Sequence, residues 1–226
     1  MRCPLNGGRA NVRQLNADGR TADVEVIEYL VPDVSQREVL GMSELSRVEQ
    51  EGRVIDDAVV IVHPFEDRDL EAIRSVVAAG LIERLFVMVW SPDDRIRTWL
   101  DSAGAVNLHT GVAMSAPDLL MVAAAEIFVY HQYNGLSSGP GKDAVVQIVR
   151  AFAAEGYPID VDPWLRAYFA AGGTFRHAES IARLIKEMAT GVKHRVTPRY
   201  GTNIVATLRD QIVDPDDRTA PASPSW

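Results

Sequence analysis

The chain has 226 residues, a net charge of −8, and 47% hydrophobic against 24% charged residues. This length suits one domain with a sizeable core, or a domain with a helical extension. The single cysteine, Cys3, excludes an internal disulfide framework and fits a reducing compartment. The N-terminus lacks the apolar run of a signal peptide, and the longest apolar stretch, Leu119–Tyr130, is too short to cross a bilayer. We therefore expect a soluble cytoplasmic protein without membrane contacts.

The charge is unevenly distributed along the chain. Residues 176–200 hold six basic residues and two acidic ones, a local net charge of +4, so the remainder carries −12. Such an asymmetry is typical of an anion-binding face on an otherwise acidic body. The six basic residues are Arg176, Arg183, Lys186, Lys193, Arg195 and Arg199.

Residues 1–22 show no clear hydrophobic period, which predicts a loop or a short hairpin. Cys3-Pro4-Leu5-Asn6-Gly7 resembles a zinc-ribbon knuckle in which the second cysteine is replaced. A structural zinc ion needs about four Cys or His ligands, and this segment offers one. We therefore interpret residues 1–22 as a loop or a degenerate knuckle without metal.

Residues 23–133 alternate between strand and helix patterns. The predicted strands are Asp23–Val31, Ala58–Val62, Leu85–Trp90 and Val106–His109, and the predicted helices are Ser35–Gln50, Leu70–Ala79 and Ile96–Ala103. The second and third strands are continuous apolar runs, typical of strands buried on both faces. Alternation at this spacing is typical of βαβ units and predicts an α/β fold with a small Rossmann-like sheet of about four parallel strands. The glycine-rich dinucleotide fingerprint is missing.

Polar residues follow these strands, at what would be one edge of the sheet. Parallel sheets bind ligands just past the carboxyl ends of their strands. The carboxylates there would hold Mg²⁺ and assist attack on a phosphate ester, or they would instead cap the helices that follow. Capping explains the acids without any chemistry and is the simpler interpretation. The catalytic candidates at this edge are Glu66, Asp67, Asp93, Asp94, His63 and His109.

Ser115–Gln132 is apolar on nearly all sides and predicts a buried helix. Its end, Ile127–Tyr130, fits a last strand as well as a helix, because so short an apolar run has no decisive period. The state of residues 126–133 is therefore left open.

Residues 134–142 form a Gly/Ser hinge loop between the two halves of the chain. Gly141-Lys142 matches the centre of a Walker-type phosphate loop, but Leu136 replaces the earlier glycine and Asp143 the hydroxyl residue. Either the loop is a structural helix entry, or the start of the following helix binds a lone anion. In the second case the contacts would come from Ser137, Ser138, Gly141 and Lys142.

Residues 143–213 predict an all-helical C-terminal part, and residues 214–226 a disordered tail. The predicted helices are 144–155, 163–171 with Asp162 as cap, 174–190 and 202–213. The second and third of these, followed by a basic β-prone segment at 193–200, resemble a helix-turn-helix with a wing. An ordinary helical hairpin with a solvated face is the alternative. Nucleic-acid contacts would come from Arg183, Lys186, Lys193, Arg195 and Arg199.

Together these patterns predict a protein that binds a phosphate-bearing ligand, a nucleotide or nucleic acid, between the acidic sheet edge and the basic helical face. One alternative is a metal-assisted phosphohydrolase or nuclease that uses the sheet-edge carboxylates with Mg²⁺. Another is a protein-interaction module whose basic face docks an acidic partner. Whether the protein is an enzyme is left open by the sequence.

Overall fold

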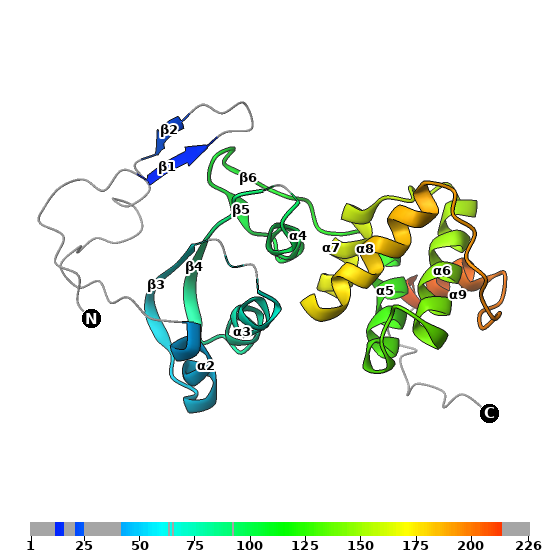
Figure 1. Cartoon of the computed structure of the whole chain (residues 1–226), viewed down its shortest axis with the longest axis horizontal. Coiled ribbons are helices and arrows are strands. Elements are labelled where there is room, and N and C mark those ends of the chain that lie inside the picture. The colour runs from blue at the N-terminus through cyan, green and yellow to red at the C-terminus, as the bar shows by residue number, and fades with distance from the viewer. Residues whose placement is uncertain are drawn as a thin grey trace, which may run out of the picture. The chain divides into compact units, whose positions relative to one another are not determined.

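The computed structural model describes residues 12–15, 21–24, 42–62, 64, 66–91 and 93–213 (Figure 1). These residues belong to two compact units, Met1–Asp94 and Arg95–Trp226. The chain is mixed α/β with a small parallel sheet, as predicted. The predicted hinge loop at 134–142 lies inside the second unit. No helix in these described ranges has the length and apolar character needed to cross a membrane.

The N-terminal unit begins with a hairpin of β1 (Val12–Leu15) and β2 (Thr21–Val24), paired antiparallel. The first two residues of the strand predicted at Asp23–Val31 belong to β2, and residues 25–31 lie outside the described part of the chain. The knuckle-like segment around Cys3 and the tail at 214–226 also lie outside it.

The predicted βαβ unit of the N-terminal unit is present. After α2 (Met42–Glu51) come β3 (Ile55–Val62), α3 (Asp67–Ala78) and β4 (Ile82–Met88). β3 and β4 are adjacent and parallel, which confirms the predicted pairing of these two runs. Their register places Val59 opposite Leu85 and Ile61 opposite Val87.

Burial of both faces of this sheet was predicted wrongly. Ile61 of β3 is buried, but the neighbouring Val60, which points to the opposite face, is 47% exposed. The core of the unit is instead formed by the residues on one face of the strands and by the buried sides of α2 and α3. These two helices pack against each other. The buried helix residues are Leu45, Val48, Leu70, Ile73 and Val76.

The prediction of about four parallel strands is also wrong, because Val106–His109 does not join the β3–β4 sheet. In the second unit, after α4 (Arg95–Ser102), β5 (Val106–Asn107) turns back at once to pair antiparallel with β6 (Val112–Ala113). The Asn107 side chain causes the turn, since its Oδ1 accepts hydrogen bonds from the N–H groups of His109 (2.9 Å) and Thr110 (3.3 Å).

The rest of the second unit is helical: α5 (Leu119–His131), a 3-10 turn η2 (Gln132–Asn134), α6 (Gly139–Ala154), α7 (Val161–Ala170), α8 (Phe175–Ala189) and α9 (Ile204–Val213). Residues 126–131 are therefore helix, not strand. α5 packs against α6, α7 and α9, which explains its apolar residues on several sides (Figure 1). At the centre of this core, Trp164 lies 5.6 Å from Phe128 and 5.1 Å from Phe152 between ring centroids.

The predicted cap of α7 is corrected by two residues. Asp160 is the N-cap, and its side chain accepts from the N–H of Asp162. Asp162, predicted as the cap, instead forms an ion pair with Arg97 of α4 and accepts a hydrogen bond from Thr98 (3.5 Å). The helix starts at Val161 because the Asp160 side chain caps it, and Asp162 in its first turn joins α7 to α4.

Candidate functional site

The acidic residues after β3 lie at the start of α3, where the helix dipole favours negative charge. Glu66 occupies the N-cap position without a side-chain cap hydrogen bond, and Asp67 and Asp69 stand in the first turn. Glu66 and Asp69 each pair with Arg68, at 3.7 Å and 3.3 Å. His63 lies outside the described residues.

The acidic residues after β4 are used in a turn. Asp94 Oδ2 accepts from the N–H of Ser91 at 3.0 Å, and the N–H of Asp93 donates to Ser91 Oγ at 3.2 Å. His109 is exposed at the tip of the β5–β6 hairpin. Among the described residues, no group of three or more His, Cys, Asp or Glu side chains is arranged to hold a metal ion.

The loop at residues 134–142, which resembles a Walker-type phosphate loop, is closely packed against itself and the core. A Cβ placed on Gly141 would lie 2.1 Å from the carbonyl oxygen of Gly135, so only glycine fits this close approach. Leu136 is fully buried, whereas Ser137 and Ser138 are exposed at the start of α6. The loop thus enters the helix with a buried leucine where the Walker pattern has glycine.

Lys142 is bound to the protein's own backbone. Its Nζ donates to the carbonyl oxygen of Arg195 at 2.9 Å. Two further α6 side chains hold the same segment: Gln147 donates to the carbonyl of Thr197 (2.8 Å) and Arg150 to that of His194 (3.0 Å). We call this segment, residues 193–200, the strap.

The strap runs beside α6 on its way from α8 to α9 (Figure 1). Gln147 also accepts, through Oε1, from the N–H groups of Arg199 (2.8 Å) and Tyr200 (3.3 Å). The strap pairs with no strand in the described part of the chain, although its sequence is β-prone. Five of its backbone groups bond to α6 side chains instead: the carbonyls of His194, Arg195 and Thr197 and the N–H groups of Arg199 and Tyr200.

The strap side chains are exposed except at positions 194, 196 and 200. Lys193, Arg195 and Arg199 are exposed, whereas the His194 side chain is only 11% exposed and Tyr200 is half-buried. His194 Nε2 lies 3.4 Å from Glu187 Oε2 of α8. The strap therefore presents its cations outward from a backbone held at several points.

Arg176, Arg183 and Lys186 lie on the exposed part of α8, at positions i, i+7 and i+10. Two of the six predicted basic residues are neutralised by carboxylates: Arg183 by Glu187 (3.9 Å) and Arg199 by the buried Asp143 (3.7 Å). Within the described ranges no carboxylate lies within 4.0 Å of the remaining four, Arg176, Lys186, Lys193 and Arg195. Residues 95–213 carry a net charge of +2, against −8 for residues 1–94.

The Tyr200 end of the strap meets the end of α5. Tyr200 Oη and His131 Nε2 lie 2.8 Å apart, and the ring of Tyr130 stands edge-on to that of His131 at 5.3 Å. Burial lowers the pKa of His131, and the positive charge of Arg199 lowers it further. Burial raises the pKa of Tyr200, a rise that Arg199 opposes and Tyr130 reinforces. Tyr130 and His131 were not predicted as part of a site, because they stand at the end of an apolar run assigned to the core.

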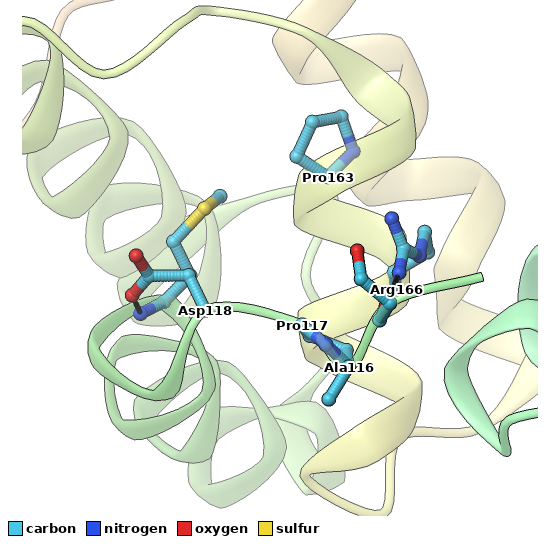
Figure 2. A pocket seen from close by; sticks show the side chains of 7 residues that line it. Ala116, Pro117, Asp118, Pro163 and Arg166 are labelled. Carbon is cyan, nitrogen blue, oxygen red and sulfur yellow. Dashed lines mark hydrogen bonds between the residues drawn. The ribbon is translucent and has the colours of Figure 1, made fainter.

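A pocket of about 410 Å³ lies between the segment before α5 and the start of α7 (Figure 2). Asp118 and Arg166 flank it from opposite sides. Both are bound to the chain itself: Asp118 caps α5 by accepting from the N–H of Leu120 (2.8 Å), and Arg166 donates to the carbonyl of Ser115. These charges anchor the segment before α5, and none of the predicted site residues lines the pocket.

Searches against protein-family models, curated proteins and solved structures found no match to this chain.

Proposed function

We propose that the helical unit binds nucleic acid, with the strap and the exposed part of α8 contacting phosphates. We call these residues the basic face: Arg176, Arg183, Lys186, Lys193, Arg195 and Arg199. The observation that carries the proposal is that α6 side chains hydrogen-bond to the backbone of the strap. The side chains of Lys193 and Arg195 are thereby left exposed to solvent.

The geometry of an extended chain explains why this matters. Side chains two residues apart on an extended backbone point to the same side, about 6.6 Å apart. Lys193 and Arg195 are exposed while His194 between them is less so, the pattern of an extended segment, and α6 holds the carbonyl groups of His194 and Arg195 in place before a ligand arrives. Ordering them therefore costs little on binding, so more of the electrostatic attraction appears as affinity. Neutralised phosphates release counterions, which favours binding at low salt.

Because the N-terminal unit is acidic, we propose that nucleic acid contacts the basic face alone. A chain of net charge −8 repels a polyanion wherever the basic face is not presented. In the N-terminal unit, the parallel β3–α3–β4 arrangement supports a Rossmann-like relationship as part of the same proposal. The single cysteine is consistent with a cytoplasmic location.

The metal-assisted hydrolase is the less favoured function. Glu66 and Asp69 both pair with the single cation Arg68, and Asp94 closes a turn with Ser91, so these three carboxylates already have partners within the protein. A protein-interaction module would use the same basic face for an acidic partner. It is distinguished by the experiment that follows, since such a protein leaves nucleic acid unbound.

The test is the salt dependence of binding to a fluorescent oligonucleotide duplex or single strand. The logarithm of affinity should fall with the logarithm of salt concentration by about 0.7 to 0.9 per phosphate contacted. Lys193→Ala and Arg195→Ala should each lower that slope by about one unit. Arg209→Ala is the matched control, because this exposed arginine already pairs with Glu155 at 3.0 Å and should leave the slope unchanged.

Absence of binding at tens of micromolar protein in low salt would refute the proposal. So would equal slopes for the strap variants and the Arg209 control. A mononucleotide ligand would be recognised by a shallow salt dependence, since it offers few phosphates.

A further inference from the structure

Two large aromatic side chains stand exposed at the C-terminal end of α5. Tyr130, in the last turn of α5, is 71% exposed, and Tyr133, in η2, is 94% exposed. A single exposed apolar residue is ordinary on a protein surface. Two exposed tyrosines within four residues are less common, and Arg199 of the strap lies close enough to His131, between them in sequence, to lower its pKa.

Tyr130 is connected to the strap by contacts, and Tyr133 follows it three residues later in the chain. Tyr130 packs edge-on against the His131 ring, and His131 hydrogen-bonds to Tyr200 at 2.8 Å. Tyr200 follows Arg199, whose N–H is bound by Gln147. Tyr130 therefore lies at the Tyr200 end of the basic face, and Tyr133 stands one 3-10 turn further along the chain in the same unit.

We infer that the ligand of the basic face is a single-stranded nucleic acid, with unpaired bases stacking on Tyr133 and Tyr130 while the strap cations contact its backbone. This inference rests on the proposed function and adds the class of nucleic acid. The combination of a basic track and exposed aromatic rings is the one that single strands require.

A duplex uses the same surface less well. Its bases are stacked on one another inside the helix, and only its phosphates reach a protein surface of this kind. Unpaired bases present their π-faces and stack on tyrosine irrespective of sequence. The tyrosines should therefore add affinity for single strands alone, whereas Lys193 and Arg195 should add it for both forms.

The experiment compares fluorescence anisotropy of the full chain with a labelled oligothymidylate of about 20 nucleotides and with a duplex of the same length. Tyr133→Ala should weaken single-strand binding roughly 10-fold at constant salt, because stacking on one aromatic side chain is worth about that factor. The salt slope should stay unchanged, since no phosphate contact is lost. Duplex binding should also stay unchanged.

Tyr133→Phe is the conservative control and should keep the wild-type affinity, since the ring remains. Trp90→Ala is the second control: Trp90 is equally exposed at 71% but belongs to the N-terminal unit, and its removal should have no effect. Tyr133 is almost fully exposed, so its variants should retain the wild-type thermal midpoint.

The outcomes separate the inference from the function beneath it. Equal affinity for both forms, with Tyr133→Ala neutral, would overturn the single-strand inference and leave nucleic-acid binding standing. Loss of affinity in Tyr133→Phe as large as in Tyr133→Ala would also overturn it, because stacking would not be the cause. If neither oligonucleotide bound, both the single-strand inference and the proposed nucleic-acid binding would be refuted.

Discussion

Gly173 lies against the ring of Tyr168 so closely that a Cβ built on the glycine would stand 2.4 Å from the ring carbons. The same tyrosine donates through Oη to Gln132 Oε1 (2.8 Å) and accepts from the N–H of Thr174 (3.0 Å). One buried side chain of α7 thus holds the end of α5 and the start of α8. The turn between α7 and α8 is determined from inside the core as well as by its glycines.

Gly173→Ala should lower the free energy of unfolding by about 2 kcal/mol or more, since the Tyr168 ring is fully buried and has no room to move aside. Gly104→Ala is the matched comparison. Gly104 has a positive φ of +74° but no atom within 4 Å of where an alanine Cβ would stand, so only backbone strain of about 1 to 2 kcal/mol applies there. Urea denaturation measures both. A smaller loss for Gly173→Ala than for Gly104→Ala would contradict the close contact.

The stability of the protein should depend on pH through His131. Its pKa is lowered in the native state by burial and by Arg199, so the unfolded chain binds a proton that the folded chain resists. Unfolding therefore becomes easier as pH falls below about 6.5, the ordinary histidine value, and the loss is complete once pH is below the native pKa. Above that ordinary value the stabilisation is fully present.

Thermal midpoints at about pH 7.5 and 5.5 check this sign. His131→Gln should reduce the difference between the two midpoints. An unchanged difference in His131→Gln would show that other groups govern acid stability.

Gln147→Ala should loosen the strap with a modest global effect. The substitution removes one donor to Thr197 and the acceptor for the N–H groups of Arg199 and Tyr200. Hydrogen exchange at those two amides should accelerate markedly, while the free energy of unfolding falls by about 1 to 2 kcal/mol. Gln211→Ala on the exposed part of α9 is the control and should change neither. Unchanged exchange at Arg199 and Tyr200 would mean that the strap is held by other groups.

In the N-terminal unit, the loss of unfolding free energy on truncating a side chain to alanine should depend strongly on whether that side chain is buried. Ile73 of α3 is fully buried, so Ile73→Ala should cost about 2 to 5 kcal/mol. Val60 of β3 is 47% exposed, and Val60→Ala should cost less than about 1 kcal/mol. Equal losses measured by denaturation would show that the exposed face of the sheet is covered in solution.

The helices of the second unit were predictable because independent signals agree. α6, α7 and α8 each combine apolar residues at helical spacing with a glycine after the last turn. Those glycines, Gly156, Gly172 and Gly191, all take the positive φ that favours glycine over other residues. Local backbone preference and core packing therefore predict the same ends.

The errors arose where one pattern fits two structures. A continuous apolar run such as that around Val60 describes a strand buried on both faces and also a strand buried on one. At Val106 the run is followed by Asn107, whose side chain turns the chain back before it can extend a sheet. Ile127–Tyr130, which the sequence left open between helix and strand, is helical because its position inside the packed helix α5 overrides the strand preference of its β-branched and aromatic residues.

The exposure of the basic residues on α8 was predictable, because the inner face of an amphipathic helix determines its outer face. The hydrogen bonds that hold the strap to α6 were not predictable. Gln147 and Arg150 bind carbonyl oxygens, which every residue possesses, so these bonds leave no signature in the amino acids they join. Asp143, which departs from the phosphate-loop pattern, is buried beside Arg199 and has a structural role instead.

Because α6 binds the strap through backbone carbonyl oxygens, the side chains of the strap can be substituted without losing these hydrogen bonds. Lys142, Gln147 and Arg150 would hold almost any amino acids at the positions they bind, provided the chain stays extended. The outward positions 193 and 195 are thus free to exchange charge, size and hydrogen-bonding groups without refolding. Selection, or a laboratory library randomised at these two positions, can alter what the protein recognises while α6 preserves where recognition takes place.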